Sequence, residues 1–279
     1  MTPVERTATP RDLSLEARRA GRSKWFDWAG RFGLAAQGVS FVIVAVLALM
    51  LATGHGGMTA DRTDALRTLA DETLGGALLV VLAAGFAAYA AWRFAEAFLD
   101  RDNEGDDPKG LGKRAGDFAK GAFYAALAFS VVGILFGADE GGEEKANKTT
   151  AGVLGWPGGR WIVFAAAAAI GIAAIWNLYR GLSRKFEEDL EVGTSETVRD
   201  WIGRIGLVGL SARGVAFGLI AWFLAKAAYD FNPKEAVSLG GALGKLASAT
   251  YGHALLAAVA GGLLAFGIFC LAQARYRDV

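Results

Sequence analysis

The chain has 279 residues, of which 53% are hydrophobic and 20% charged, and it contains 38 glycines but only 5 prolines. This composition is too apolar for an ordinary soluble or disordered chain, and it favours a membrane protein. The formal net charge of +1 excludes the basic footprint of nucleic-acid-binding proteins. One cysteine and two histidines exclude a disulfide framework and a structural Cys/His zinc site, and we expect no metal or other cofactor.

Six apolar stretches are long enough to cross a bilayer, which takes about 20 helical residues. Five carry no charge, and the sixth contains Arg213. They are apolar all round, where a helix at the surface of a soluble protein would show a polar stripe. In chain order, the predicted spans are Phe32–Leu51, Gly75–Trp92, Gly121–Gly137, Trp161–Leu178, Ile205–Ala225 and Gly252–Ala274.

Lysine and arginine are distributed unevenly between the two sides of the predicted membrane. The N-terminal segment, the loops 93–117 and 180–204 and the C-terminal tail carry 19 of these residues, and the opposite loops carry 8. The excess of basic residues marks the cytoplasmic side. We therefore expect a multi-pass protein of the bacterial inner (plasma) membrane with both termini in the cytoplasm.

An internal repeat divides the chain. Residues 27–34 return as 200–207 with six of eight positions identical, and a Gly-x-x-Ala-[Gln/Lys/Arg]-Gly pattern begins at Gly33, Gly116 and Gly209. Each copy is predicted to be a helix hairpin that enters from the same side. The expected fold is an all-α integral membrane protein whose six helices form three parallel tandem hairpins around a pseudo-three-fold axis along the membrane normal. The predicted divisions are a cytoplasmic segment 1–24 and the two-helix repeats 25–100, 101–190 and 191–279, which together make one membrane domain.

These repeats resemble the domain of unknown function 1206 family, bacterial membrane proteins of three tandem two-helix modules. Each module of that family opens with an Arg-x-Gly…Ala-Arg-Gly-like helix, and the resemblance runs from about Trp25 to the C-terminus. Arg213 keeps the arginine of the pattern, whereas Gln37 and Lys120 replace it. The resemblance implies the six-span topology and supplies no activity or functional residue.

The sequence shows no catalytic constellation, so we expect a protein that is not an enzyme. The segment 240–246 resembles a phosphate-binding loop but lacks its first glycine and its final Ser/Thr. The charge-free spans hold no Asp or Glu, which disfavours a proton relay. Cys270 in the last span is interpreted as a small packing residue.

Cationic side chains gather near the predicted cytoplasmic ends of the spans. Gln37, Lys120 and Arg213 occupy equivalent repeat positions, and Arg93 and Arg180 end the second and fourth spans. We hypothesise a ring of donors centred on Arg213 that binds an anionic phospholipid or a phosphate-bearing ligand. The alternatives are snorkelling of Arg213 to the headgroups, an anion channel or transport path along the axis, and a scaffold that docks a membrane-protein partner or a second copy.

Small residues at helical spacing bear on this choice. The sets Ala165/Ala169/Ala173 and Gly214/Gly218 predict close approach of helix backbones, which leaves little room for a lumen and favours binding over conduction. The glycines expected to pack helices are Gly38, Gly121, Gly214 and Gly218.

Overall fold

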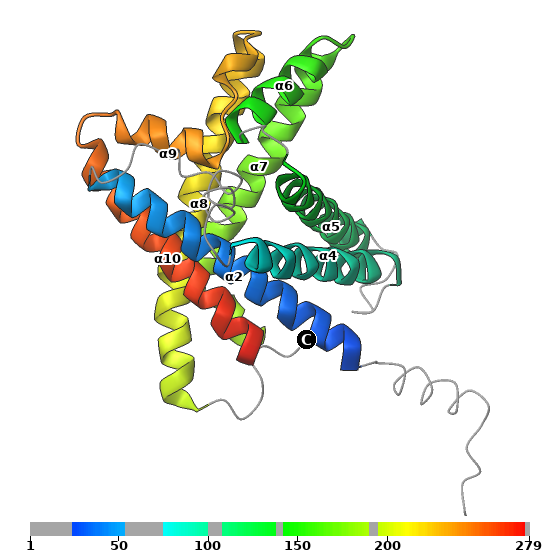
Figure 1. Cartoon of the computed structure of the whole chain (residues 1–279), viewed down its shortest axis with the longest axis vertical. Helices are drawn as coiled ribbons and strands as arrows, with labels where there is room; N and C mark the ends of the chain where they lie inside the picture. Colours follow the sequence, from blue (N-terminus) through cyan, green and yellow to red (C-terminus); the bar gives the residue numbers. More distant parts are fainter. Residues whose placement is uncertain (1–23, 54–74, 100–107, 138–141, 190–194, 277–279) are drawn as a thin grey trace, which may run out of the picture.

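The computed structural model describes residues 24–53, 75–99, 108–137, 142–189 and 195–276, so residues 1–23 of the predicted cytoplasmic segment lie outside it. The regular structure of the described residues is helical, without a strand. Six helices are long and apolar enough to cross a membrane, which confirms the six predicted spans (Figure 1). They are α2 (Lys24–Ala52), α4 (Gly75–Leu99), α5 (Pro108–Leu135), α7 (Gly159–Leu182), α8 (Glu196–Tyr229) and α10 (Gly252–Tyr276).

Short helices that the sequence did not predict join some of these spans. They are α6 (Gly142–Leu154), η1 (Lys185–Asp189), η2 (Pro233–Glu235) and α9 (Leu239–Ala247). The Ser238 hydroxyl accepts a hydrogen bond from the Gly241 N–H and so caps α9. Glu143 of α6 in turn accepts from the Ser238 N–H and hydroxyl, at 3.2 and 3.1 Å. These bonds tie the loop of the second repeat to the loop of the third, on the side predicted to be outer.

The long helices pack lengthwise between repeats. The second helix of each repeat lies against the first helix of the next: α4 with α5, α7 with α8, and α10 with α2. The last pair closes the cycle, and the Arg31 guanidinium donates to the Arg275 carbonyl at 3.2 Å. Figure 1 shows the three pairs pointing in different directions. The repeats therefore follow one another in cyclic order, while a common axis along the membrane normal stays a prediction.

Equivalent glycines lie at the three pair interfaces. A Cβ at any of these positions would come within 3.0 Å of one side chain of the facing helix, so a larger residue would force that side chain or the helices to shift. The contacts are Gly38 with Leu271, Gly121 with Phe94, and Gly214 with Leu178. Gly218 differs from the expectation, because a Cβ there would meet no described residue within 4 Å. Ala165 and Ala169 of the predicted small-residue stripe are likewise exposed.

The aromatic core repeats as well. Phe41 of α2 and Phe266 of α10 are buried and form an edge-to-face pair with ring centroids 4.8 Å apart. Tyr124 of α5 lies four residues after Lys120, as Phe41 lies four after Gln37, and it forms the same kind of pair with Tyr89 of α4 at 4.6 Å. Edge-to-face pairs contribute about 0.5–1.5 kcal/mol beyond the area they bury. The two interfaces are thus built on the same plan.

Candidate functional site

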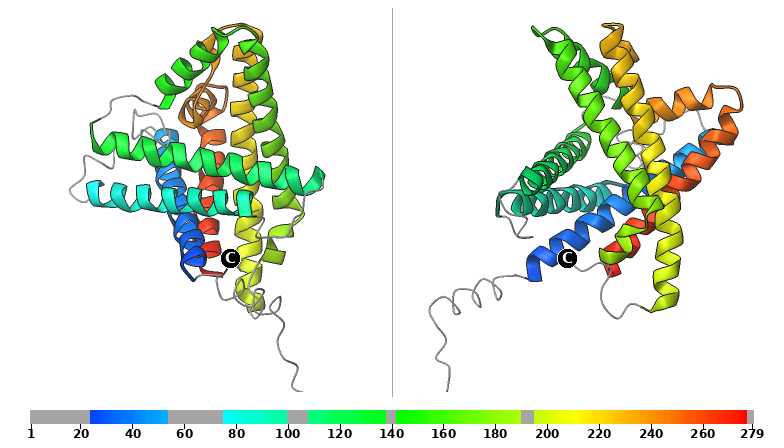
Figure 2. Two further views of the ribbon diagram at one scale, coloured as in Figure 1. Left: turned by 90° about the vertical axis from the view of Figure 1, so that its right-hand side faces the viewer. Right: turned by 180° about the vertical axis from the view of Figure 1, so that it is seen from behind.

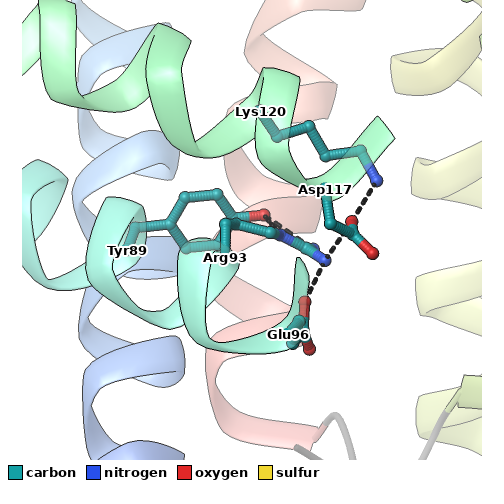
Figure 3. Close-up of polar contacts among 5 residues, drawn as sticks. All are labelled: Tyr89, Arg93, Glu96, Asp117 and Lys120. Carbon is teal, nitrogen blue, oxygen red and sulfur yellow. Dashed lines mark hydrogen bonds and ion pairs between the residues drawn. The ribbon is translucent and has the colours of Figure 1, made fainter. Parts of the chain in front are cut away.

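Arg93 of α4 is the centre of a buried ionic cluster between α4 and α5 (Figure 3). Its Nε and Nη2 donate to the Tyr89 hydroxyl at 3.1 and 2.9 Å. Its Nη1 donates to Glu96 at 2.6 Å and to Asp117 of α5 at 2.9 Å. The guanidinium also lies 4.3 Å from the centroid of the Trp92 ring. Every nitrogen of this buried cation therefore has an acceptor within the protein.

Lys120 of α5 completes the cluster from outside. Its ammonium donates to Asp117 at 2.9 Å, and its side chain is 56% exposed, against 10% for Arg93. Two cations and two carboxylates balance one another, so this part of the predicted ring carries no surplus charge. The cluster holds α4 and α5 together, and its donors are already engaged.

The sequence reasoning missed this cluster because it ended the spans at the first charge. Glu96 and Asp117 lie just beyond the charge-free stretches, yet the apolar helices continue through both of them. The absence of carboxylates from the charge-free stretches thus does not extend to α4 and α5. The spacing of Arg93 with Glu96 and of Asp117 with Lys120, three residues each, was the available signal, since such residues are neighbours on a helix surface.

Arg213 lies in a different setting, halfway along α8, which packs against α10. Its guanidinium carbon is 4.7 Å from the ring centroid of Phe266, 4.8 Å from that of Phe217 and 5.8 Å from that of Phe41. Its Nε is buried without a hydrogen-bond partner. The guanidinium forms no ion pair or hydrogen bond with another residue in the described part of the chain.

The helices around Arg213 cross closely. A Cβ on Gly209, one turn before Arg213, would lie 2.5 Å from the Phe266 Cα, so the backbones of α8 and α10 touch there. On the other side of α10, a Cβ on Gly267 would lie 2.8 Å from Val42 of α2. Contacts of this kind leave the helices little freedom to shift. The guanidinium is therefore held in place by the three phenylalanines and by the crossing.

None of the other predicted donors forms a hydrogen bond or ion pair with Arg213 in the described residues. Gln37 is buried in α2, one turn before Phe41. Arg180 is half-buried in the last turn of α7. Lys120 and Arg93 engage Asp117 as described above. Arg93 and Lys120 thus belong to a neutral cluster around Asp117, whereas Arg213 lies among phenylalanine rings, and the ring of five donors stays a prediction.

A second polar cluster, formed by Lys226, Glu235 and Lys245, lies on the predicted outer side. Glu235 accepts from Lys226 at 3.0 Å and from Lys245 at 3.4 Å. The hydrogen bond from Lys226 lowers the pKa of the Glu235 carboxyl below its ordinary value of 4.5. The segment 240–246 forms most of α9, and its Lys245 pairs with Glu235, so this lysine is not poised for a phosphate. No group of three metal-ligating side chains occurs in the described ranges.

The three repeats match one family of known proteins. Residues 32–100, 115–184 and 208–277 each match the family described as Domain of Unknown Function (DUF1206). A similar protein is the Bacillus subtilis (strain 168) "Uncharacterized protein YxxB", which is 30% identical over 258 residues, 91% of this chain and 92% of the relative. No solved structure matches the chain. Phe94, Leu178 and Leu271, which contact the three pair glycines, each lie six residues before the end of a matched segment.

Proposed function

The chain belongs to the DUF1206 family of three-repeat proteins and is a multi-pass membrane protein, and we propose that it binds an oxyanion at Arg213. The oxyanion is either the phosphate of a lipid headgroup or a small free anion, because both present the same acceptor oxygens to a guanidinium. Gln37 of α2, one turn before Phe41, occupies the same repeat position as Arg213. We propose no catalytic role for the protein.

The observation that carries this proposal is the contrast between the buried Arg93 and the half-buried Arg213. Arg93 meets two carboxylates and a hydroxyl, whereas Arg213 meets three aromatic faces and keeps an unbonded Nε. A cation–π contact contributes about 0.5–2 kcal/mol. A charged residue at the centre of a membrane helix costs about 2.5–3.5 kcal/mol on insertion scales. The rings therefore offset part of the cost, and an anion that accepts from Nε supplies the missing partner.

Position along α8 disfavours simple snorkelling. Arg204, the last charged residue before the apolar stretch, lies nine residues from Arg213, about 13 Å along a helix. The guanidinium also lies against Phe41 and Phe266 of neighbouring helices, so it is directed into the protein. A side chain that snorkels extends toward the headgroups instead.

The close helix crossings favour binding over conduction. The backbones of α8 and α10 are in contact beside Arg213, which leaves no continuous path at that crossing. The uneven distribution of basic residues supports an orientation with both termini in the cytoplasm of a bacterial cell. In that orientation, the Arg93 cluster lies at the cytoplasmic end of its helices and Arg213 lies deeper.

Native mass spectrometry of the gently purified full chain tests the proposal. We expect a phosphate-bearing adduct on the wild type that is lost from Arg213→Gln. The matched control is Arg204→Gln, which removes an exposed cation from the same helix and should keep the adduct. The mass of the adduct distinguishes a phospholipid from a free anion, and thermal unfolding with added inorganic phosphate checks the second source.

Three results would overturn the proposal. Equal adducts on wild type and Arg213→Gln would show that the ligand binds elsewhere. A complete absence of adducts, together with unfolding temperatures that do not respond to inorganic phosphate, would favour the scaffold role. Anion currents in planar bilayers that disappear in Arg213→Gln would shift the assignment from binding to conduction.

A further inference from the structure

The two helices within a repeat also cross, and in the first and third repeats they do so through equivalent residues. In the first, Gly33 of α2 contacts Tyr89 of α4, and a Cβ on Gly85 would lie 2.5 Å from that of Ala36. In the third, a Cβ on Gly209 of α8 would lie 2.5 Å from the Phe266 Cα of α10. Gly262 in the same repeat contacts Ala212, as Gly85 contacts Ala36. The crossing is thus a feature of the repeat itself.

The second repeat has the residues for the same crossing but does not make it. Gly116 of α5 is the counterpart of Gly33 and Gly209, yet a Cβ there would meet no described residue within 4 Å. Ala119 of α5 and Ala169 of α7, the counterparts of Ala36 and Gly85, are both exposed. Figure 2 shows the α4/α5 pair running across the direction of the α7/α8 pair, and α5 and α7 lack the packing that joins the other two helix pairs of a repeat.

The exposed faces are suited to close packing. Small residues on both helices allow backbones to approach, which is the main source of helix association in a membrane. The two completed crossings show which helix covers such a face, namely the other helix of the same repeat. For α5 that partner is α7.

Closure would also move Lys120. Arg213, its counterpart, contacts Phe266 of its own repeat and Phe41 of the next repeat. In the second repeat, the counterpart of Phe266 is Ala173 of α7, because both lie 11 residues before the end of a matched segment. The counterpart of Phe41 in the following repeat is Phe217 of α8. A closed second repeat would therefore place Lys120 beside Ala173 and Phe217. Phe217 already lies 4.8 Å from the Arg213 guanidinium. A closed second repeat therefore brings two cations to one phenylalanine, and like charges at this distance repel unless an anion lies between them.

We propose that the second repeat is a gate that closes α5 onto α7 when an oxyanion binds at Arg213. This inference rests on the proposed function, since the anion offsets the repulsion between Arg213 and Lys120. In the open state Lys120 is exposed and pairs with Asp117. In the closed state the ammonium exchanges Asp117 for the bound anion, and Gly116 and Ala119 become buried against α7.

Cysteine cross-linking in membranes tests the gate. Cys270 is the one native cysteine, so a Cys270→Ser background carries Ala119→Cys with Ala169→Cys. We expect a short bridging reagent to join the two sites within one chain in neutral phosphatidylcholine vesicles when inorganic phosphate is added, or in vesicles that contain phosphatidylglycerol. The two vesicle arms separate a free anion from a lipid headgroup. The anion should raise the cross-linking rate about 5- to 150-fold, the usual range of coupling between a ligand and a conformational change.

Variants of the two cations separate the gate from the binding site. Arg213→Gln should remove the dependence on the anion, and Lys120→Gln should close without an anion because the repulsion is gone. Each single cysteine variant serves as the control for cross-links between two copies. The same bridge placed across the α2/α10 pair, with Arg31→Cys and Arg275→Cys, should form with or without the anion, because the Arg31 side chain already reaches the Arg275 backbone.

Three outcomes would overturn the gate. If Ala119→Cys and Ala169→Cys never cross-link while the α2/α10 control does, the second repeat stays open, whatever the mass spectrometry shows about binding. A rate that is unchanged by anions and by Arg213→Gln would mean that closure is not coupled to Arg213. Cross-links that join two chains would identify the open faces as a contact between copies.

Discussion

Two arginines in this protein show two ways of keeping a cation within apolar helices. Arg93 is neutralised by carboxylates of its own helix and of α5, and its side chain is 10% exposed. Arg213 lies among aromatic rings without a carboxylate in the described residues. Removal of one partner from a buried ion pair is costly because the other charge remains buried. Loss of Arg93 should therefore leave buried carboxylates without a counter-charge and destabilise the fold, whereas loss of Arg213 leaves no carboxylate of the described residues unpaired.

Arg93→Gln is expected to destabilise the protein by about 3–5 kcal/mol, because Glu96 and Asp117 lose their buried counter-charge. Thermal unfolding in detergent measures the loss. Lys120→Gln is the matched control, since Lys120 binds the same Asp117 from an exposed position and should change stability by at most about 1 kcal/mol. Adding Asp117→Asn to Arg93→Gln should restore part of the stability. Equal losses in Arg93→Gln and Lys120→Gln would contradict the assignment of Arg93 as the buried centre.

The helices pack through glycines whose role depends on the repeat. Gly33 and Gly209 lie at completed crossings, and Gly116, at the same repeat position, faces open space. One sequence pattern thus gives two different packing environments. The matched positions allow the cost of a side chain at a crossing to be measured within one protein.

Gly209→Ala is expected to destabilise the protein by about 1–3 kcal/mol, because the added Cβ would lie 2.5 Å from the Phe266 Cα and the backbones must separate. Gly116→Ala should be neutral or stabilising by up to about 1 kcal/mol, since alanine favours the helix and meets no neighbour. Unfolding temperatures of the two variants in the same detergent provide the comparison. A similar loss in both would mean that the second repeat is closed under these conditions.

The pairing of Glu235 with Lys226 and Lys245 in the third repeat predicts that the stability of the protein depends on pH. The hydrogen bond from Lys226 lowers the pKa of Glu235 in the folded protein below its ordinary value of 4.5. A lowered folded pKa stabilises the protein above the unfolded pKa, and this stabilisation disappears as the pH falls through the folded pKa. The wild type should therefore exceed Glu235→Gln in stability at pH 7, and the difference should begin to shrink near pH 4.5 and vanish once the pH falls below the lowered folded pKa. A difference that persists in acid would show that Glu235 acts through packing alone.

At the scale of the whole molecule, charge-free length located five of the six helices, and the sixth followed once Arg213 was allowed inside an otherwise apolar run. The same criterion ended the second span at Trp92 and so missed Glu96, which α4 carries one turn further. The repeat pattern aligned Gly38, Gly121 and Gly214 correctly, since each meets an equivalent residue. Pairing between repeats did not follow from the sequence, because a hairpin pattern does not state which neighbour covers each helix face. The open second repeat was hidden for the same reason, since Gly116 and Ala119 match their packed counterparts in kind.

The cyclic order of the repeats predicts that the chain can be opened elsewhere. Arg31, two turns into α2, donates to the Arg275 carbonyl near the end of α10, so a linker can connect these two helices. A circular permutant that begins at Ser195 and ends at residue 194 keeps the α10 to α2, α4 to α5 and α7 to α8 pairs intact. We expect it to insert, to fold and to unfold within a few degrees of the wild type. Truncation after residue 194 is the control, because it leaves α2 without α10 and exposes the face around Phe41 and Gly38. If the permutant fails as completely as the truncated chain, the lengthwise pairs form only in the native chain order, and the cyclic arrangement is not what holds the fold together.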